Sequence, residues 1–596
     1  MTIDQFLARI AIVAVVTGCS SPTDTTPPGD LTVATVTLDE AALTFDALGL
    51  TTQLTAQVRN TEGQLLQNGV TWTVANGNAV TVSASGLVTA QGNGTATVRA
   101  TAGGKTGEVQ VTVAQVPAGL LVSALPPALT LLGARTALTG TVLDGNDRVI
   151  VDAPITWSSS NTAVLPIEDN SVLVAARPGS SVITATAGTF TDQATVNVTL
   201  SGPLGGPLLG NEVLCNGGTA GPFPCTNVKL MSYLPVSGMG AGAGVDLNDL
   251  WGWVDPQTNR EYVIVMRRDG TAFVDVTDPL NPAYLGFLPI PAGATPNTWH
   301  DVKVYQNHAF IVADGAGPHG MQVFDLTTLR GVTIPRTFSV VTRYTNIASA
   351  HNIFINEATG FAYSVGGSSG GTTCGGGLHM ISIQNPANPV FAGCFADPLT
   401  GRSGTGYTHD VQCVIYSGPD ATYTGKEICF GSNETAISIS DVTIKAAPVA
   451  ISRASYPAVA YTHQGWLTAD QQYFLVNDEL DEGNGSVTGT RTLVWDVSDL
   501  DDPILVNQYL GPTTATDHNH YIRDNRMYMS NYQFGLRVVD VSNPLSPTQI
   551  GSFDTAPNLA NTPGFGGSWS NYPFFPSGNI VMTSRNEGFY VLRMMN

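Results

Sequence analysis

The sequence predicts an all-β protein in which two β-sandwiches precede a seven-bladed β-propeller. The 596-residue chain holds 64 Gly and 36 Pro but only 12% charged residues, which favours many turns and few surface helices. Two segments near the N-terminus repeat one pattern of short strands, and their tryptophans, Trp72 and Trp157, stand 85 residues apart. Beyond residue 211, a histidine returns every 51 to 58 residues at one position of a repeated unit.

Residues 1–19 are predicted to be a lipoprotein signal peptide. Arg9 precedes an apolar run, Ile10 to Val16, that is too short to span a bilayer. The following Thr17-Gly18-Cys19 completes a sequence that resembles a bacterial lipobox, which implies cleavage before Cys19 and lipidation of its thiol; an ordinary signal peptide is the alternative. Residues 20–31 are rich in Pro, Thr and Ser and are interpreted as an extended tether. We therefore expect an exported lipoprotein in the outer membrane or at the cell surface, periplasm-facing or extracellular, with this anchor as its one membrane attachment.

The cysteines support an oxidising compartment. Removal of Cys19 leaves six of the seven, an even number. Proximity in the sequence favours three disulfides, Cys215–Cys225, Cys374–Cys394 and Cys413–Cys429, among the connectivities that six cysteines allow. In the third pair, both cysteines would lie on adjacent strands of one repeat unit.

Residues 32–114 and 118–200 are predicted to be tandem β-sandwiches. The first contains Val70-Thr71-Trp72 and the second Ile155-Thr156-Trp157, each among strands that alternate apolar residues with Thr or Ser. These motifs resemble bacterial immunoglobulin-like domains of surface proteins. A stalk that lifts the next domain from the membrane is our interpretation, with adhesion as the alternative.

From residue 211 to 596 the chain repeats a four-strand unit. Its first strand starts at the histidine position, its second is apolar and aromatic, and its third ends in an Asp motif such as Phe273-Val274-Asp275. The Asp side chain is expected to accept hydrogen bonds from backbone N–H groups of the next turn. A period of about 50 residues with four strands indicates a β-propeller.

The ends of the repeat region predict how the ring closes. The last unit, which begins at Ser570, ends at its third strand, around Phe589 to Arg593. Residues Val228 to Pro235, just before the first unit, match the pattern of a fourth strand. This early strand is predicted to complete the last of seven blades and to remove the sheet edge.

The repeats also resemble a known family. Trp251-Gly252-Trp253, Ala350-His351-Asn352 and the segment from Tyr461 to Trp466 are similar to the LVIVD repeat, and the region from about residue 225 resembles choice-of-anchor B proteins. The resemblance implies a shared extracellular domain joined to a surface anchor, here a lipidated Cys19. It implies no particular chemistry.

The histidine position is the strongest candidate site. In a propeller, residues that begin the first strands converge at one mouth of the central channel. Five histidines do so here: His300, His351, His409, His463 and His518. The next position forms a second ring, composed of Asp249, Asp301, Asn352, Asp410, Gln464, Asn519 and Asn571, and a loop adds Asp478 and Glu479 to the same face. Imidazoles with carboxylates suit Zn, Cu, Mn or Fe, and the oxygen-rich loop suits Ca. Structural roles in the channel are the alternative.

Two functions follow as hypotheses. The first is a non-enzymatic binding protein for a surface protein, peptide or glycan, with a divalent metal as its candidate cofactor. The second is a metal-dependent extracellular hydrolase or oxidase that uses the histidines. A net charge of −21 and a pI of about 4.6 argue against nucleic-acid binding, because no basic stripe is present to neutralise phosphates.

Overall fold

The computed structural model describes residues 30–129, 133–176, 179–198 and 206–595. The predicted signal peptide, its lipidation site Cys19 and most of the tether lie outside these ranges. Strands dominate the described residues, which include three short 3-10 helices, η1 (Val236–Met239), η2 (Leu326–Leu329) and η3 (Cys374–Gly376). Within the described ranges, no helix has the length and apolar character needed to cross a membrane. The predicted all-β class is confirmed.

The first module is a β-sandwich. One sheet has the order β2-β9-β8-β5, the second has the order β3-β7-β6, and β1 pairs with β4. Phe45, Val88, Val98 and Val111 are buried in its core, against which the half-buried Trp72 packs. Its strands are β1 (Val33–Leu38), β2 (Ala42–Phe45), β3 (Thr51–Gln53), β4 (Ala56–Asn60), β5 (Thr71–Asn76), β6 (Val80–Val82), β7 (Leu87–Ala90), β8 (Gly94–Ala102) and β9 (Lys105–Val113).

The second module repeats the first strand for strand. Its sheets have the orders β11-β18-β17-β14 and β12-β16-β15, and β10 pairs with β13. Leu165, Leu173, Ile183 and Val196 form part of its core, with Trp157 packed against them. Its strands are β10 (Gly119–Val122), β11 (Ala128–Leu129), β12 (Arg135–Ala137), β13 (Gly140–Leu143), β14 (Thr156–Ser159), β15 (Ile167–Glu168), β16 (Val172–Val174), β17 (Gly179–Ala187) and β18 (Phe190–Val198).

Within the described part of the remaining chain, seven sheets follow one another as blades. Each consists of four antiparallel strands. They follow one another in the chain except in blade 2, where β29 intervenes, and in the last blade; two blades carry additional short strands. Blade 1 comprises β22 (Leu247–Val254), β23 (Glu261–Arg267), β24 (Gly270–Asp275) and β25 (Ala283–Pro289), with β29 (Arg336–Thr337) beside β25. Blade 2 comprises β26 (His300–Tyr305), β27 (His308–Ala313), β28 (Met321–Asp325) and β30 (Thr342–Tyr344). Blade 3 comprises β31 (Asn352–Asn356), β32 (Phe361–Val365), β33 (Leu378–Ser382) and β34 (Val390–Phe395).

Blades 4 to 7 complete the set. Blade 4 comprises β35 (Asp410–Ile415), β36 (Glu427–Ser432), β37 (Ile437–Asp441) and β38 (Val449–Ala454). Blade 5 comprises β39 (Thr462–Leu467), β40 (Tyr473–Asp478), β41 (Arg491–Asp496) and β42 (Ile504–Leu510). Blade 6 comprises β43 (His520–Arg523), β44 (Arg526–Asn531), β45 (Gly535–Asp540) and β46 (Thr548–Phe553), extended by β20 (Phe223–Thr226) and β19 (Thr219–Ala220). Blade 7 comprises β47 (Ser568–Tyr572), β48 (Ile580–Ser584), β49 (Gly588–Met594) and the early strand β21 (Val228–Pro235).

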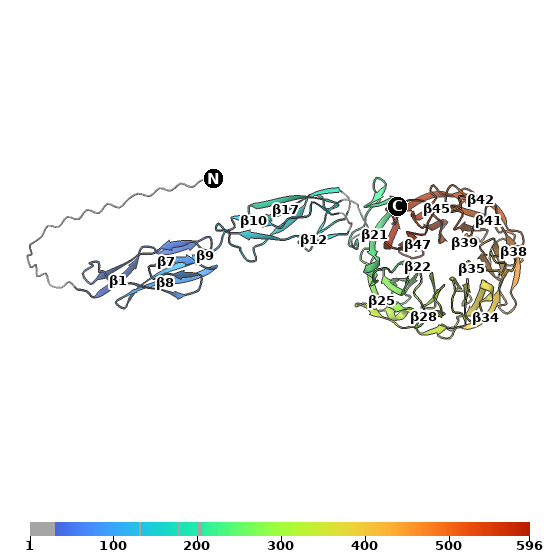
Figure 1. Cartoon of the computed structure of the whole chain (residues 1–596), viewed down its shortest axis with the longest axis horizontal. Helices are drawn as coiled ribbons and strands as arrows, with labels where there is room; N and C mark the ends of the chain where they lie inside the picture. The colour runs from blue at the N-terminus through green and yellow to red at the C-terminus, as the bar shows by residue number, and fades with distance from the viewer. Residues whose placement is uncertain (1–29, 130–132, 177–178, 199–205, 596) are drawn as a thin grey trace, which may run out of the picture. The chain divides into compact units, whose positions relative to one another are not determined.

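The blades form a closed ring. The first strands contact their neighbours in the order β22, β26, β31, β35, β39, β43 and β47, and β47 contacts β22 again. Figure 1 labels β22, β35, β39 and β47 around the centre of the ring. As predicted, β21 closes the last blade: it pairs antiparallel with β49, from Val228 opposite Met594 to Pro235 opposite Gly588. The seven-bladed propeller is thus confirmed in its blade number and its closure.

The Asp motif has the structural role predicted for it. The carboxylate of Asp275 accepts a hydrogen bond from the Thr277 N–H at 3.0 Å, and Asp496 and Asp540 accept equivalent bonds from Ser498 and Ser542 at 2.9 and 2.8 Å. Each bond satisfies a backbone donor at the turn between the third and fourth strands.

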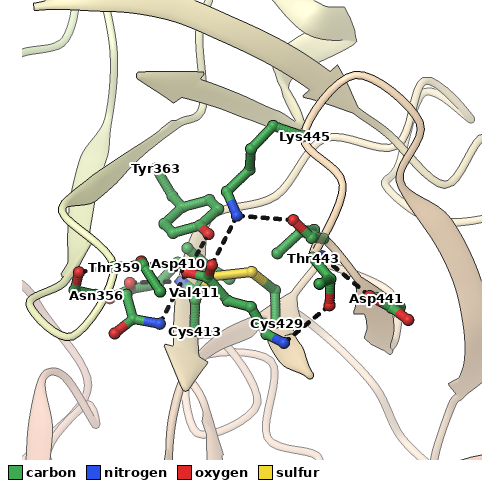
Figure 2. The surroundings of a disulfide bond; sticks show 12 residues. Asn356, Thr359, Tyr363, Asp410, Val411, Cys413, Cys429, Asp441, Thr443 and Lys445 are labelled. Atoms are coloured by element: carbon green, nitrogen blue, oxygen red, sulfur yellow. Dashed lines mark hydrogen bonds and ion pairs between the residues drawn. A yellow bond between two sulfur atoms is a disulfide. The ribbon is translucent and has the colours of Figure 1, made fainter. Parts of the chain in front are cut away.

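The three predicted disulfides are present: Cys215–Cys225, Cys374–Cys394 and Cys413–Cys429. Cys413 lies directly opposite Cys429 on β35 and β36, with their Cα atoms 4.0 Å apart. Figure 2 shows the polar network around this disulfide.

A buried carboxylate in this network joins two blades. Glu427, at the start of β36, accepts hydrogen bonds from Asn356 Nδ2 at 2.8 Å, Thr359 Oγ1 at 2.9 Å and the Tyr363 hydroxyl at 2.5 Å, all in blade 3. Lys445 Nζ lies 2.6 Å from its other oxygen. Since every oxygen has partners, the buried charge ties blades 3 and 4 together rather than destabilising them.

Candidate metal centre

The starts of the first strands bring four of the five predicted histidines together. His351, His409, His463 and His518 form a row, with ring centroids 4.3, 4.3 and 4.7 Å apart along it. His300 begins β26 but stacks edge-on against His319, at 5.6 Å. It shares with the row a cavity of about 10 Å³, which has room for a single water-sized ligand; the cavity is lined by Trp299, His300, His351, Asn352, His409, His518, Asn519 and Trp569.

Two carboxylates reach this row: Asp314, whose Oδ2 lies 3.0 Å from His351 Nδ1, and Glu479. Glu479 follows β40, and its Oε1 lies 3.9 Å from His463 Nε2 and 3.8 Å from His518 Nε2. The Tyr532 hydroxyl donates a 3.1 Å hydrogen bond to the same oxygen. The three ligand atoms lie within 4.8 Å of one another, which makes this group a candidate metal site.

His463 and His518 present neutral imidazoles. Burial holds the pKa of His463 far below its ordinary value, and it lowers the pKa of His518 to about 3. His518 Nδ1 donates to the Trp569 carbonyl at 2.5 Å, so its unprotonated nitrogen is the Nε2 that faces Glu479. Burial also raises the pKa of Glu479 to about 7. Neutral imidazoles beside a carboxylate are the state in which these groups bind a metal.

Three carboxylates of the predicted set lie elsewhere. Asp478 accepts hydrogen bonds from the Tyr456 hydroxyl at 2.9 Å and from the Ala460 and Tyr461 N–H groups at 2.7 and 2.8 Å, so it holds the chain before β39. Asp301 and Asp410 lie at the channel position that follows His300 and His409. The structure therefore brings together His463, His518 and Glu479, with His351 and His409 beside them.

A buried lysine compensates the negative charges of the channel aspartates. Lys303, two residues after Asp301 on β26, is buried, and its Nζ lies 2.7 Å from Asp301 Oδ1. Asp301 Oδ2 accepts the Ile353 N–H at 2.7 Å. Asp249 and Asp410 are close enough to interact electrostatically with the same ammonium group. Lys303 was not among the residues predicted for the site, although the two-residue period of a strand puts it on the channel face with Asp301.

The channel beyond Lys303 is aromatic. The ammonium group of Lys303 lies 4.6 Å from the centroid of the Trp251 ring. A cavity of about 260 Å³ opens at this level and is lined by Trp251, Lys303, Val304, Phe354, Ile355, Glu357, Trp466, Tyr572 and Phe574. The channel thus carries histidines at one mouth, carboxylates below them and aromatic rings at the far end.

The buried aspartates of the channel predict that the free energy of unfolding depends on pH. Burial raises the pKa of Asp410 from its ordinary value of 3.8 to about 7. The folded protein therefore binds an extra proton between these two values, so this contribution favours folding at low pH and is lost as the pH rises to about 7. In that window we expect the free energy of unfolding to fall by up to about 1.4 kcal/mol per pH unit for this carboxyl. Calorimetric Tm values from pH 4 to pH 8 measure the slope.

Two variants test the origin of that slope. Asp410→Asn should reduce the slope by the share of this one carboxyl, because other buried carboxyls with raised pKa values, such as Glu479, also contribute. Asp540→Asn should leave it unchanged, because turn hydrogen bonds from Ser542 lower the pKa of Asp540 below the window. Equal slopes in wild type and Asp410→Asn would contradict the assignment.

Comparison with known proteins identifies two modules. The bacterial Ig-like domain (group 2) matches residues 32–113, and the LVIVD repeat matches residues 524–555, which include β44 and β45 of blade 6. Ice-binding protein 1 of Shewanella frigidimarina is 31% identical over 156 residues, which are 25% of this chain and 17% of that protein. The chain therefore spans about a sixth of the length of this relative.

Two solved structures are similar at low identity. A protein from Lactobacillus plantarum is 12% identical, with a TM-score of 0.39, over 56% of this chain and 88% of its own. A functionally unknown protein from Desulfotomaculum acetoxidans is 12% identical, with a TM-score of 0.37, over 57% of this chain and 94% of its own.

Proposed function

We propose that this protein is an exported, surface-anchored binding protein of the choice-of-anchor B type. Lipidated Cys19 would hold it at the membrane, the Ig-like modules would serve as a stalk, and the propeller would bind a surface protein, peptide or glycan. Three disulfides support an extracellular location, because such bonds persist in oxidising compartments. The Ig-like and LVIVD matches, with the partial similarity to an ice-binding protein, support a modular surface protein.

We further propose that the propeller mouth holds a transition metal of the zinc class. The observation that carries this proposal is the pair of buried Nε2 atoms that face one Glu479 oxygen at 3.9 and 3.8 Å. Ligand atoms around tetrahedral zinc stand about 3.4 Å apart, so each of these two His–Glu distances would shorten by about half an ångström when the metal binds. The set of two histidines and one glutamate fits zinc in its donor types.

Elemental analysis of the purified full chain, exported to an oxidising compartment and kept from chelators, tests this proposal. We expect about one transition metal per chain, and its loss in a His463→Ala/His518→Ala double variant. The matched control is His308→Ala, because His308 lies at the start of β27 and bonds only locally, through Nδ1, to the Gln306 carbonyl. A chain without metal, or metal retained in the double variant, would refute the proposed centre.

An enzyme is the second candidate function. Two histidines and one glutamate leave a fourth zinc position open, as in catalytic zinc sites, and a cavity with room for one small ligand adjoins His518. Such a centre would supply metal-assisted hydrolysis or oxidation. Turnover of chromogenic ester, phosphate or glycoside substrates by the wild type, and not by the double variant, would favour the enzyme. Glycan or protein binding that survives chelation would favour a binding surface away from the metal.

A further inference from the structure

The aromatic end of the channel forms a cavity that the histidine centre does not use. Its volume is about 260 Å³. Three of the rings that line it come from the first strands of different blades: Trp251 from β22, Phe354 from β31 and Trp466 from β39. Phe574, just after β47, adds a fourth ring, whose centroid lies 6.1 Å from that of Trp251 and 6.2 Å from that of Trp466. Blades 1, 3, 5 and 7 thus contribute aromatic rings to one cavity.

These rings are held in place but are not covered. The buried Tyr521 contacts both tryptophans, with ring centroids 5.5 Å from Trp251 and 5.1 Å from Trp466. Phe354 contacts Trp466 edge-on at 6.0 Å. Trp251, Phe354, Trp466 and Phe574 are all half-buried, so each keeps part of its surface accessible. Fixed aromatic surface around a cavity, together with a few polar groups, is the usual composition of a ligand site.

One positive and one negative group border the cavity. Lys303 lines it with a side chain that is 9% exposed and that Asp301 holds through a 2.7 Å contact with Nζ. Glu357, in the loop after β31, is exposed and lines the same cavity. A cationic ligand would be repelled by the Lys303 ammonium group, which already lies 4.6 Å from the Trp251 ring centroid, and an anionic ligand would be repelled by Glu357. A neutral ligand with hydroxyl groups avoids both penalties, because a hydroxyl accepts from an ammonium group and donates to a carboxylate.

We infer that this cavity binds a neutral sugar, free or at the end of a glycan, through a pyranose ring whose hydroxyl groups are all equatorial, as in a β-glucoside. The inference rests on the proposed binding function and assigns a place and a ligand class to it. Such a ring has two flat faces of C–H groups, and aromatic faces attract C–H groups because they carry partial negative charge. An axial hydroxyl would make one face polar and would press it against an aromatic ring without a partner. The cavity is slightly smaller than the pockets of drug-sized ligands, which begin at about 300 Å³, and therefore suits one sugar ring.

Isothermal titration calorimetry of the full chain tests this inference with two epimers, methyl β-glucoside and methyl β-galactoside. They differ only in the hydroxyl group at carbon 4, which is equatorial in the glucoside and axial in the galactoside. We expect the glucoside to bind at least about tenfold more tightly, because the axial hydroxyl would lose water without gaining a partner. Cellotriose tests the source of the ring. Tighter binding than that of the glucoside would indicate the end of a glycan chain, and equal binding would indicate a free sugar.

Two variants locate the site. Trp466→Ala should weaken the binding of methyl β-glucoside at least about tenfold, because it removes one aromatic ring from the cavity wall. Glu357→Ala should weaken it about tenfold through the loss of a hydrogen bond to a charged group, and this variant should fold like wild type because the residue is exposed. The matched control is Phe391→Ala. It removes a 40% exposed ring from β34, the outer strand of blade 3, and should leave the affinity unchanged.

The outcomes separate this site from the other proposals. Binding of the glucoside should persist in EDTA and in His463→Ala/His518→Ala, because the cavity and the histidines lie at opposite ends of the channel. No binding of the glucoside and cellotriose, equal affinities for the two epimers, or full affinity in both Trp466→Ala and Glu357→Ala would overturn the inference. A peptide or glycan that binds wild type and Trp466→Ala equally well would then still support the binding function proposed above. A chain that binds no surface protein, peptide or glycan would contradict that function itself.

Discussion

Replacement of Lys303 by methionine is expected to destabilise the propeller by about 3–5 kcal/mol. The change keeps most of the side-chain volume but removes the ammonium group that lies 2.7 Å from buried Asp301. Asp301 would then keep a buried charge without its cation, next to Asp249 and Asp410. Urea unfolding of the full chain at pH 8, followed by tryptophan fluorescence, measures the loss.

The matched control is Lys426→Met. Lys426 pairs with Asp441 at 3.1 Å, but its side chain is 41% exposed, so its loss should cost less than about 1 kcal/mol. The Lys303→Met penalty should also shrink at pH 5, where Asp410 is protonated. A Lys303→Met variant that unfolds at the same urea concentration as Lys426→Met would show that the aspartates need no cation.

Removal of β21 is expected to prevent the propeller from folding cooperatively. Val228, Leu230, Met231, Tyr233 and Leu234 of this strand are all at most 5% exposed. Their burial contributes roughly 8–15 kcal/mol, which is comparable with the whole stability of a typical domain. Without β21, the edge of β49 is also free to pair with other chains.

Two truncated chains make the comparison. A chain that begins at residue 206 retains β21 and should give a monomer with one sharp propeller transition. A chain that begins at residue 236 should aggregate or unfold without cooperativity, as measured by gel filtration and calorimetry. Equal behaviour of the two chains would mean that the ring closes without its early strand.

The repeat period carried most of the fold prediction. A motif that returned at each unit located the blades, and the missing fourth strand of the last unit identified β21 as its substitute. Disulfide pairing followed from proximity along the chain. These features depend on local sequence pattern, which the repeat preserves.

The site was harder to predict, because register within a strand decides where a side chain lies. Irregular pairing occurs near the channel mouth in β22, β39 and β47. One extra residue turns the following side chains to the other face. Asn571 accordingly donates to the Tyr528 carbonyl and to Ser530 Oγ of blade 6. Its position in the repeat alone had predicted a place in the second ring of the channel. Glu479 and Asp478 are neighbours in one loop, yet only the geometry shows which of them faces the histidines.

The closing strand also sets the order in which this protein can fold. The Tyr233 hydroxyl donates to the Glu587 carbonyl, a contact between residues 354 positions apart in the chain. A chain made or exported from its N-terminus presents β21 well before β49, so the ring cannot close until β49 is available. Leu208 and Val213 form β-bridges with Tyr233 and Leu230. The segment before β21 can therefore cover one edge of β21 before β49 pairs with the other. Until blade 7 is complete, the other edge is open to pairing with neighbouring chains, so slow or crowded export is the stage at which this protein is most exposed to misassembly.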